Sequence, residues 1–291
     1  MSGRVSDETL RSMPLPELDG EVDKNSRGRL LLIGGSVEAP GGILLAALAA
    51  LRAGAGKVRI ATVATHAAAM AVAMPEARVI ALPDEGGDIA GGTDRISKES
   101  LRTGAIVLGP GMFDTRAAAR LVDSLLGRDG PPIVADAAAL AHIRDYPGRG
   151  RLVLTPHGGE MARMIGSSED AVAADPATHA RQAARDLGAV VALKGAETHI
   201  AAPDGRTWLF EGGCVGLATA GSGDVLAGII GGLLARGADT VTATLWGVHL
   251  HGAAGRRLSE RVGALGFLAR ELPGEVPGLL SKQDSAFARR E

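Results

Sequence analysis

The segment RLLLIGGSVEAPGGILLAALAALRAGAGKVRIATV, residues 29–63, decides the fold of this chain. It opens with a continuous apolar run that ends in glycines, and residues 42–56 then carry the alanine and leucine content of a helix closed by Gly54 and Gly56. Residues 57–63 return to a β-type run. This order predicts a strand, a helix and a second strand, and uninterrupted apolar strands are typical of parallel sheets covered by helices on both faces.

The same alternation continues along the chain. Residues 198–210 differ, because two short alternating runs around a Pro-Asp-Gly turn predict a β-hairpin. The fold class is therefore α/β, with a mostly parallel central sheet and helices on both faces. Further strands are expected at 77–82, 105–109, 131–136, 151–155 and 189–195, and helices at 65–74, 114–127, 158–165, 175–187, 224–236 and 238–258.

The composition suits one globular domain. Hydrophobic residues make up 46% of the 291 residues but aromatics only 2%, so the core must be built from Ala, Leu, Val and Ile in tightly packed helices. No change in composition marks a linker. We expect an N-terminal extension over residues 1–28, a single domain over 29–276 and a charged, frayed tail over 277–291.

Several classes of protein are excluded by charge and by cysteine content. With 31 Lys and Arg against 33 Asp and Glu, the chain lacks the basic surface that binds nucleic acid or an anionic membrane. The sequence shows no signal-peptide pattern and no apolar run long enough to suggest a membrane span, and the lone Cys214 excludes an intrachain disulfide and a cysteine-rich metal site. We expect a cytoplasmic protein with small-molecule partners.

The candidate site follows from the sheet. In open α/β sheets, ligands bind beyond the carboxyl ends of the strands, so the residues that end each strand should meet at one edge. These strand-end residues are Gly34, Gly35, Ser36, Gly109, Gly111, Asp136, residues 155–160, Lys194 and Gly195.

The stretch ATAGSGDVLAGIIGGLLARG, residues 218–237, places a glycine-rich turn before an apolar helix. The backbone amides of Gly221, Ser222 and Gly223, with the positive end of the helix, could form an anion site that suits a phosphoryl group. Asp224 could then take a proton from a hydroxyl that attacks phosphorus. The alternative is that Asp224 is merely the N-cap of the helix. The residues alone support these two interpretations of Asp224 about equally.

Other candidates also carry two interpretations. His157 lies in a strand-to-helix loop and is either part of a surface turn or a ligand contact, and Lys194 either extends outward to solvent or contacts a nucleotide. His249 and His251 are two residues apart on a helix and so face different sides, which excludes a helical metal pair and indicates packing or interface roles. Cys214 is expected to be a small packing side chain.

Two common nucleotide motifs are absent. Neither GGSVEAPGG nor RAGAGKVRI matches the P-loop pattern, and neither offers a complete G-x-G-x-x-G between a strand and a helix. A P-loop NTPase and a standard Rossmann dehydrogenase are therefore disfavoured.

Several motifs, taken in order, resemble those of the ADP- or ATP-dependent NAD(P)H-hydrate dehydratases of the ribokinase-like superfamily. The resemblance covers the chain from about Lys24 to Leu258. Each motif alone is weak, but their order and spacing are specific. The motifs are LLIGGS, PGGILLAALAALRAGAG, GPG at 109–111, TPHGGEMARM, ALKGAETHI and ATAGSGDVLAGIIGGLLARG.

The resemblance implies a repair reaction in which a nucleotide phosphorylates the ring hydroxyl of hydrated NADH or NADPH, so that phosphate leaves in place of hydroxide. It implies that Asp224 is the base and that the amides of Gly221, Ser222 and Gly223 hold the transferring phosphoryl group. It further implies Mg²⁺ carried by ADP or ATP, and a homo-oligomer. The implied nucleotide contacts are Lys194, Gly195, Ala196, Glu197, Thr198 and Gly223, and the implied contacts of the hydrated cofactor are Gly42, Gly111, His157 and Asp224.

The chain departs from the family pattern at a few positions. Ala138 stands where relatives commonly have a second aspartate, Gly42 replaces an alanine, and Cys214 replaces an asparagine. Only about 28 residues precede the first core strand, too few for the epimerase domain that many relatives carry, so we expect no epimerase activity. The substitutions at Gly42, Ala138 and Cys214 concern substrate contacts more than the phosphoryl-transfer centre.

Two other functions are compatible with the residues. A small-molecule kinase of the same superfamily, of the thiazole or sugar kinase type, would use the same turn and Asp224 but release a phosphorylated product. A nucleotide-binding protein without catalysis is the second alternative. The TPHGGE and ALKGAETHI motifs favour the dehydratase, since a kinase has no evident need of them.

Overall fold

The computed structural model describes residues 2–17, 28–144, 146 and 148–288. Lys24, where the family resemblance begins, lies outside the described residues. A ten-stranded sheet runs through the molecule in the order β1-β12-β11-β10-β9-β8-β7-β2-β3-β4. Every neighbouring pair is parallel except those made by β11, so the prediction of a mostly parallel sheet is confirmed.

The strands form where the sequence predicts them. The first β-α-β unit is β2 (Arg29–Ile33), α2 (Gly41–Arg52) and β3 (Lys57–Val63). The predicted hairpin is β11 (Thr198–Ala201) with β12 (Thr207–Phe210). The other predicted strands are β4 (Ala77–Leu82), β7 (Ala105–Leu108), β8 (Ile133–Ala135), β9 (Leu152–Leu154) and β10 (Ala189–Leu193).

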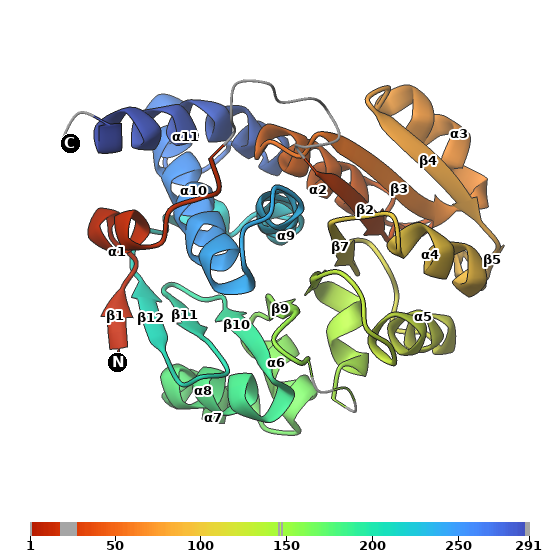
Figure 1. Cartoon of the computed structure of the whole chain (residues 1–291), viewed down its shortest axis with the longest axis horizontal. Helices are drawn as coiled ribbons and strands as arrows, with labels where there is room; N and C mark the ends of the chain where they lie inside the picture. Colours follow the sequence, from red (N-terminus) through yellow and green to blue (C-terminus); the bar gives the residue numbers. More distant parts are fainter. Residues whose placement is uncertain (1, 18–27, 145, 147, 289–291) are drawn as a thin grey trace.

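Helices cover both faces of this sheet (Figure 1). In β2, the buried side chains of Leu30 and Leu32 join the core on one face, and Leu31 and Ile33 join the core on the other. This explains the uninterrupted apolar sequence of the strand. The first face is covered by α2, α9 (Ser222–Ala235), α10 (Thr240–Arg261) and α11 (Leu272–Ala288), and the second by α4 (Thr93–Ser100), α5 (Arg116–Leu126), α6 (Gly158–Ile165) and α8 (Pro176–Leu187).

The structure contains some short elements that the sequence pattern does not predict. They are the β5 (Asp84–Glu85) and β6 (Asp88–Ile89) hairpin, α4, α7 (Glu169–Ala174) and three 3₁₀ turns, η1 (Ala137–His142), η2 (Val215–Leu217) and η3 (Ala269–Glu271). Most are too short to show a clear period. Helix α3 (Ala64–Ala73) was predicted within one residue at either end.

The two ends of the chain join the fold. Strand β1 (Ser2–Arg4) pairs with β12 and α1 (Asp7–Ser12) buries Leu10 completely. The prediction of a frayed segment from residue 277 is wrong for the helix, because α11 continues to Ala288. Leu272 and Val276, one helical turn apart, are fully buried and hold this helix on the core. Among the described residues, none of the helices combines the length and the apolar character that a transmembrane span requires.

Helix α9 packs unusually close to its neighbours. A Cβ atom on Gly228 would lie 2.2 Å from the carbonyl oxygen of Ala46 in α2, and a Cβ atom on Gly231 would lie 2.3 Å from Val107 in β7. Since real Cβ atoms do not approach other atoms so closely, glycine sets the distance between these elements.

Substituting Gly228→Ala should therefore destabilise the protein by about 1–3 kcal/mol, the typical cost of overpacking a core. Gly274→Ala is the matched control, because a Cβ atom there meets nothing within 4 Å, and it should stabilise helix α11 by about 0.5–1 kcal/mol. Urea unfolding of the two variants measures both effects, and equal stabilities would contradict the packing argument.

Candidate active site

The strand-end residues do meet at one edge of the sheet, as predicted. A Cβ atom on Gly109 would lie 1.8 Å from the carbonyl oxygen of Asp136, so β7 and β8 end in close contact. The hydroxyl of Thr155 donates to Asp136 Oδ1 at 2.7 Å, and His157 pairs with Lys194 in a short parallel bridge. The ends of β7, β8, β9 and β10 therefore form one continuous wall.

Asp224 lies in the first turn of α9, facing this wall. The helix begins at Ser222, two residues earlier than predicted, and its N-cap is Gly221, in the left-handed conformation at φ +88°. The interpretation of Asp224 as the N-cap is therefore wrong. A Cβ atom on Gly42 would lie 3.0 Å from Asp224 Oδ2, so the first turn of α2 borders the carboxylate. Among the described residues, nothing forms a hydrogen bond or ion pair with this carboxylate.

The surroundings of Asp224 favour its protonated form. Burial raises the pKa of Asp224 to about 7, the charge of Asp136 adds to the rise, Lys194 opposes it, and Glu160 adds a smaller increase. A carboxyl group with a pKa near neutrality is well matched to proton transfer at neutral pH.

The glycine-rich turn needs one correction. The amide of Ser222 donates to the carbonyl of Thr219 at 3.2 Å, because the left-handed Gly221 closes a tight turn. Of the three amides predicted to hold a phosphoryl group, that of Ser222 is therefore already engaged. The amides of Gly221 and Gly223 remain candidates for an anion site.

His251 supports this turn from below, a role that the sequence did not indicate. Its Nε2 atom lies 3.1 Å from the carbonyl oxygen of Ser222 and 3.0 Å from its hydroxyl oxygen. A carbonyl oxygen can only accept, so Nε2 carries the proton. Burial lowers the pKa of His251 to about 4, which keeps the ring neutral. His249 instead packs edge-on against Phe210, as predicted.

Lys194 points into the site and not outward to solvent. Its Nζ atom lies 3.0 Å from Asp136 Oδ1 and 3.9 Å from Glu160 Oε2. Burial lowers the pKa of Lys194, but the charges of Asp136 and Glu160 more than offset this, so its pKa lies above the usual value. The group is an ammonium ion held by two carboxylates.

His157 caps helix α6. Its Nδ1 atom accepts from the amide of Gly159 at 3.1 Å, while Glu160 Oε2 accepts from the amide of His157 at 2.8 Å, which completes a capping box. Because Nδ1 accepts, the neutral ring carries its proton on Nε2. The side chain is 56% exposed, so this N–H can donate to a ligand while the cap stays in place.

A cavity of about 470 Å³ opens beside Lys194, which is large enough for a small-molecule ligand. Of the residues predicted to contact a nucleotide, Lys194, Gly195, Ala196 and Glu197 line this cavity, whereas Thr198 does not. Gly223 adjoins it, since a Cβ atom there would lie 3.2 Å from Lys194 Nζ. The remaining lining residues are Gly158, Val172, Ala173, Pro176, Leu193 and His199.

The other predicted substrate residue, Gly111, lies across from α2. Its φ is +69°, and a Cβ atom would lie 2.3 Å from the carbonyl oxygen of Ala39, in the loop that leads into α2. Cys214 packs near Gly255, as expected of a small side chain. Within the described ranges, no group of three or more His, Cys, Asp or Glu residues is arranged to hold a metal ion.

Comparisons with known proteins place these features in a family. The model of the NAD(P)H-hydrate dehydratase family matches residues 30–277. The ADP-dependent (S)-NAD(P)H-hydrate dehydratase of Xanthomonas campestris pv. campestris is 47% identical over 96% of both chains, and the Bacillus subtilis protein of the same name is 39% identical over 90% of this chain and 92% of that one.

A solved structure agrees with the sequence comparisons. The ADP/ATP-dependent NAD(P)H-hydrate dehydratase from Bacillus subtilis, co-crystallised with ATP and Mg²⁺, superposes with a TM-score of 0.85 at 35% identity, covering 97% of this chain and 98% of the other. The family model covers most of this chain, and relatives of that name are 39% and 47% identical to it over at least 90% of its length. This chain therefore belongs to the NAD(P)H-hydrate dehydratase family.

Proposed function

We propose that this protein is an ADP-dependent NAD(P)H-hydrate dehydratase, in which Asp224 removes the proton of the hydrate hydroxyl. The observation that carries the proposal is the half-buried carboxylate of Asp224, which has a pKa near 7 and no partner among the described residues. It lies between Gly42, a proposed substrate contact, and Lys194, at the mouth of the proposed nucleotide cavity.

The residues suggest how the reaction proceeds. The hydroxyl oxygen of the hydrated ring attacks the terminal phosphorus of the nucleotide as Asp224 takes its proton, and the bond from phosphorus to the bridging oxygen breaks. Lys194 places a positive charge where negative charge accumulates. The carbon–oxygen bond then breaks, phosphate leaves with the electron pair, and a ring proton is lost, which restores the reduced nicotinamide.

Binding roles follow from the same geometry. We infer that residues 194–197 and Gly223 contact the nucleotide, with Thr198 further from the cavity. Gly111 and the Nε2–H group of His157 would contact the hydrated cofactor, and the amides of Gly221 and Gly223 the transferring phosphoryl group. Ser222 would contribute indirectly, by holding the turn through its bonds to Thr219 and His251.

Magnesium would be carried by the phosphates of the nucleotide. Its usual ligands are oxygens, and it commonly binds one or two carboxylates together with phosphates and water. Asp136 Oδ1 already accepts from Thr155 and Lys194, which leaves Asp136 Oδ2 and Glu160 Oε1 as candidate oxygens. When bound, the ion would neutralise phosphate charge. Cytoplasmic location and a homo-oligomer stay predictions of the sequence.

The decisive assay mixes the purified protein with NADH hydrate and either ADP or ATP, and follows the return of reduced-nicotinamide absorbance. We expect recovery with ADP. A small-molecule kinase would instead consume nucleotide and leave a stable phosphorylated product. The absence of recovery with both nucleotides would refute the proposal.

Asp224→Asn should reduce turnover by about 10²–10⁴-fold, the usual contribution of a general base. Nucleotide binding, measured by calorimetry, should change little, because the carboxylate acts on the hydroxyl and does not hold the nucleotide. Asp94→Asn, on the exposed surface of α4, is the control and should behave like the wild type. Full turnover in Asp224→Asn would show that another group is the base.

The pH dependence of kcat/KM tests the electrostatics. Activity should rise with pH through about 7, because the base must be ionised. Asp136→Asn removes the nearest negative charge and should lower the pKa of Asp224, so that the acid limb moves to lower pH. Asp94→Asn is the control. If the acid limb of the kcat/KM profile lies at the same pH in wild type, Asp136→Asn and Asp94→Asn, the charge of Asp136 does not raise the pKa of Asp224.

The raised pKa also has a cost in stability. The folded protein binds the Asp224 proton more tightly than the unfolded chain, so stability is lost as pH rises from about 4 to about 7. Asp224→Asn should therefore stabilise the protein above pH 7 by on the order of 2–4 kcal/mol, at about 1.4 kcal/mol per pKa unit, and much less at pH 4. Thermal unfolding at pH 4.5 and pH 8 measures the difference, and a gain that is equal at both pH values would contradict it.

A further inference from the structure

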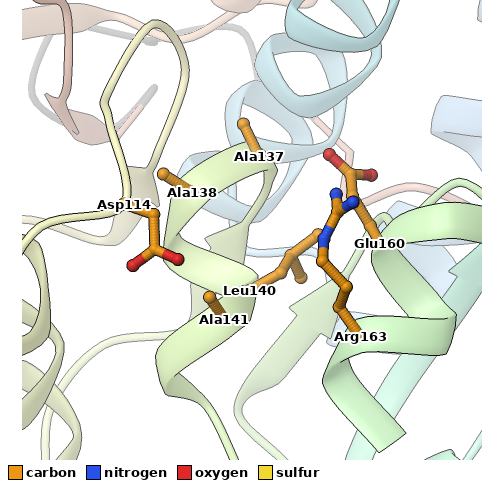
Figure 2. A pocket seen from close by; sticks show the side chains of 7 residues that line it. All are labelled: Asp114, Ala137, Ala138, Leu140, Ala141, Glu160 and Arg163. Atoms are coloured by element: carbon orange, nitrogen blue, oxygen red, sulfur yellow. The ribbon is translucent and has the colours of Figure 1, made fainter. Parts of the chain in front are cut away.

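A second, smaller cavity lies on another side of helix α6. Figure 2 shows it around the 3₁₀ turn η1, with Asp114 on one side and Glu160 and Arg163 on the other. Its volume is about 170 Å³. We name it the alanine cavity after its floor. It is lined by Asp114, Ala137, Ala138, Leu140, Ala141, Glu160 and Arg163.

The alanine cavity and the nucleotide cavity meet at the reaction centre. Glu160 lines the first and Lys194 lines the second, and their charged atoms are 3.9 Å apart. Helix α6 contacts η1, which floors the alanine cavity, and α7, which walls the nucleotide cavity. Two ligands can therefore approach the site from different sides of α6.

The volumes indicate what each cavity can hold. The larger one, at about 470 Å³, falls in the usual range for a complete small ligand, whereas 170 Å³ is below that range. The alanine cavity can thus hold only a part of a larger molecule. A hydrated dinucleotide is such a molecule, because only its nicotinamide ring has to reach Asp224.

The position of the cavity along the chain supports the same assignment. Asp114 follows Gly111 by three residues, and Glu160 follows His157 by three residues. Gly111 and His157 are the proposed contacts of the hydrated ring. The proposed contacts of the ring are therefore close in sequence to two residues that line the alanine cavity.

The lining carries groups that suit a ribose-phosphate. Arg163 is exposed and, in the described part of the chain, has no hydrogen bond or ion pair, so its planar set of N–H donors is available for phosphate oxygens. The carboxylate of Asp114 is exposed, with Oδ1 2.9 Å from His142 Nε2, and it can accept from a ribose hydroxyl. Ala138 adds only a methyl group to the lining, so it leaves space and carries no charge.

We propose that the alanine cavity binds a ribose-phosphate unit of the hydrated dinucleotide and that Arg163 contacts its phosphate. This inference depends on the proposed function, since it assigns part of the same substrate. The two substrates would then enter the active site from different cavities. The phosphoryl donor would bind in the large cavity, and the phosphoryl acceptor would extend into the small one.

The first test fills the cavity. Ala138→Leu should raise the KM for NADH hydrate by about tenfold or more, while the KM for ADP stays within about twofold of wild type. Ala71→Leu is the control, because it adds the same side chain on the exposed surface of α3, away from both cavities, and should leave both KM values unchanged. Ala196→Leu, in the nucleotide cavity, should give the reciprocal result, with a raised KM for ADP.

The second test removes the charge. Arg163→Gln should raise the KM for the hydrate about tenfold with little change in kcat, and Arg163→Lys should recover part of the loss. Arg181→Gln, on the exposed side of α8, is the control. A loss confined to NADPH hydrate would assign Arg163 to the 2′-phosphate, and an equal loss for both hydrates would assign it to the pyrophosphate.

Binding of NADPH, followed by its fluorescence, separates this proposal from the proposed function. If the wild type restores NADH from its hydrate but Ala138→Leu and Arg163→Gln retain its KM and its NADPH affinity, the cavity assignment is wrong and the function stands. If the wild type lacks turnover but binds NADPH, and both variants weaken that binding, the cavity assignment holds and the function fails. Thermal unfolding confirms that each variant is folded, and a wild type that neither turns over hydrate nor binds NADPH overturns both.

Discussion

The close approach of helix α9 to its neighbours sets the geometry of this protein. Gly228 faces the backbone of α2 and Gly231 faces β7, at distances that a Cβ atom would not allow. Since α2 and α9 both begin at the carboxyl edge of the sheet, this packing brings Gly42 against the carboxylate of Asp224. The glycines of an apolar helix thus position the carboxylate of Asp224, and the core is continuous with the candidate site.

The charges at the edge of the sheet depend on one another. Asp136, Glu160 and Asp224 surround the single ammonium group of Lys194, and Asp136 takes the closest contact. Because Lys194 pairs with Asp136 and Glu160 and not with Asp224, its charge only partly offsets the effects of burial and of Asp136, and the pKa of Asp224 remains near 7. The same arrangement that makes Asp224 a suitable base makes its ionised form costly in the folded state.

Much of this could be predicted from the sequence, for physical reasons. Continuous apolar strands imply a parallel sheet, and parallel strands that end at one edge imply that Asp136, His157 and Lys194 meet. The features that could not be predicted from the sequence depend on tertiary contacts. No sequence period could show that His251 lies under Ser222, that Lys194 turns inward to Asp136, or that the amide of Ser222 is taken by Thr219. The helix formed by α11 was missed because its Gly and Pro residues obscure the apolar spacing that buries Leu272 and Val276.

The hydrogen bonds divide the site into held and open groups. Asp136 Oδ1 accepts from both Thr155 and Lys194, Glu160 accepts from the amide of His157, and the Nδ1 atom of His157 accepts from an amide of its own helix. These bonds restrict the side chains before any ligand arrives. Among the described residues, the carboxylate of Asp224 and the guanidinium of Arg163 lack such bonds, and Nε2 of His157 has only the longer contact with Glu160 Oε1 at 3.6 Å. Polar groups held by the protein provide a rigid frame, and the groups left open are those that a substrate must satisfy, which is how a preorganised site gains both affinity and rate.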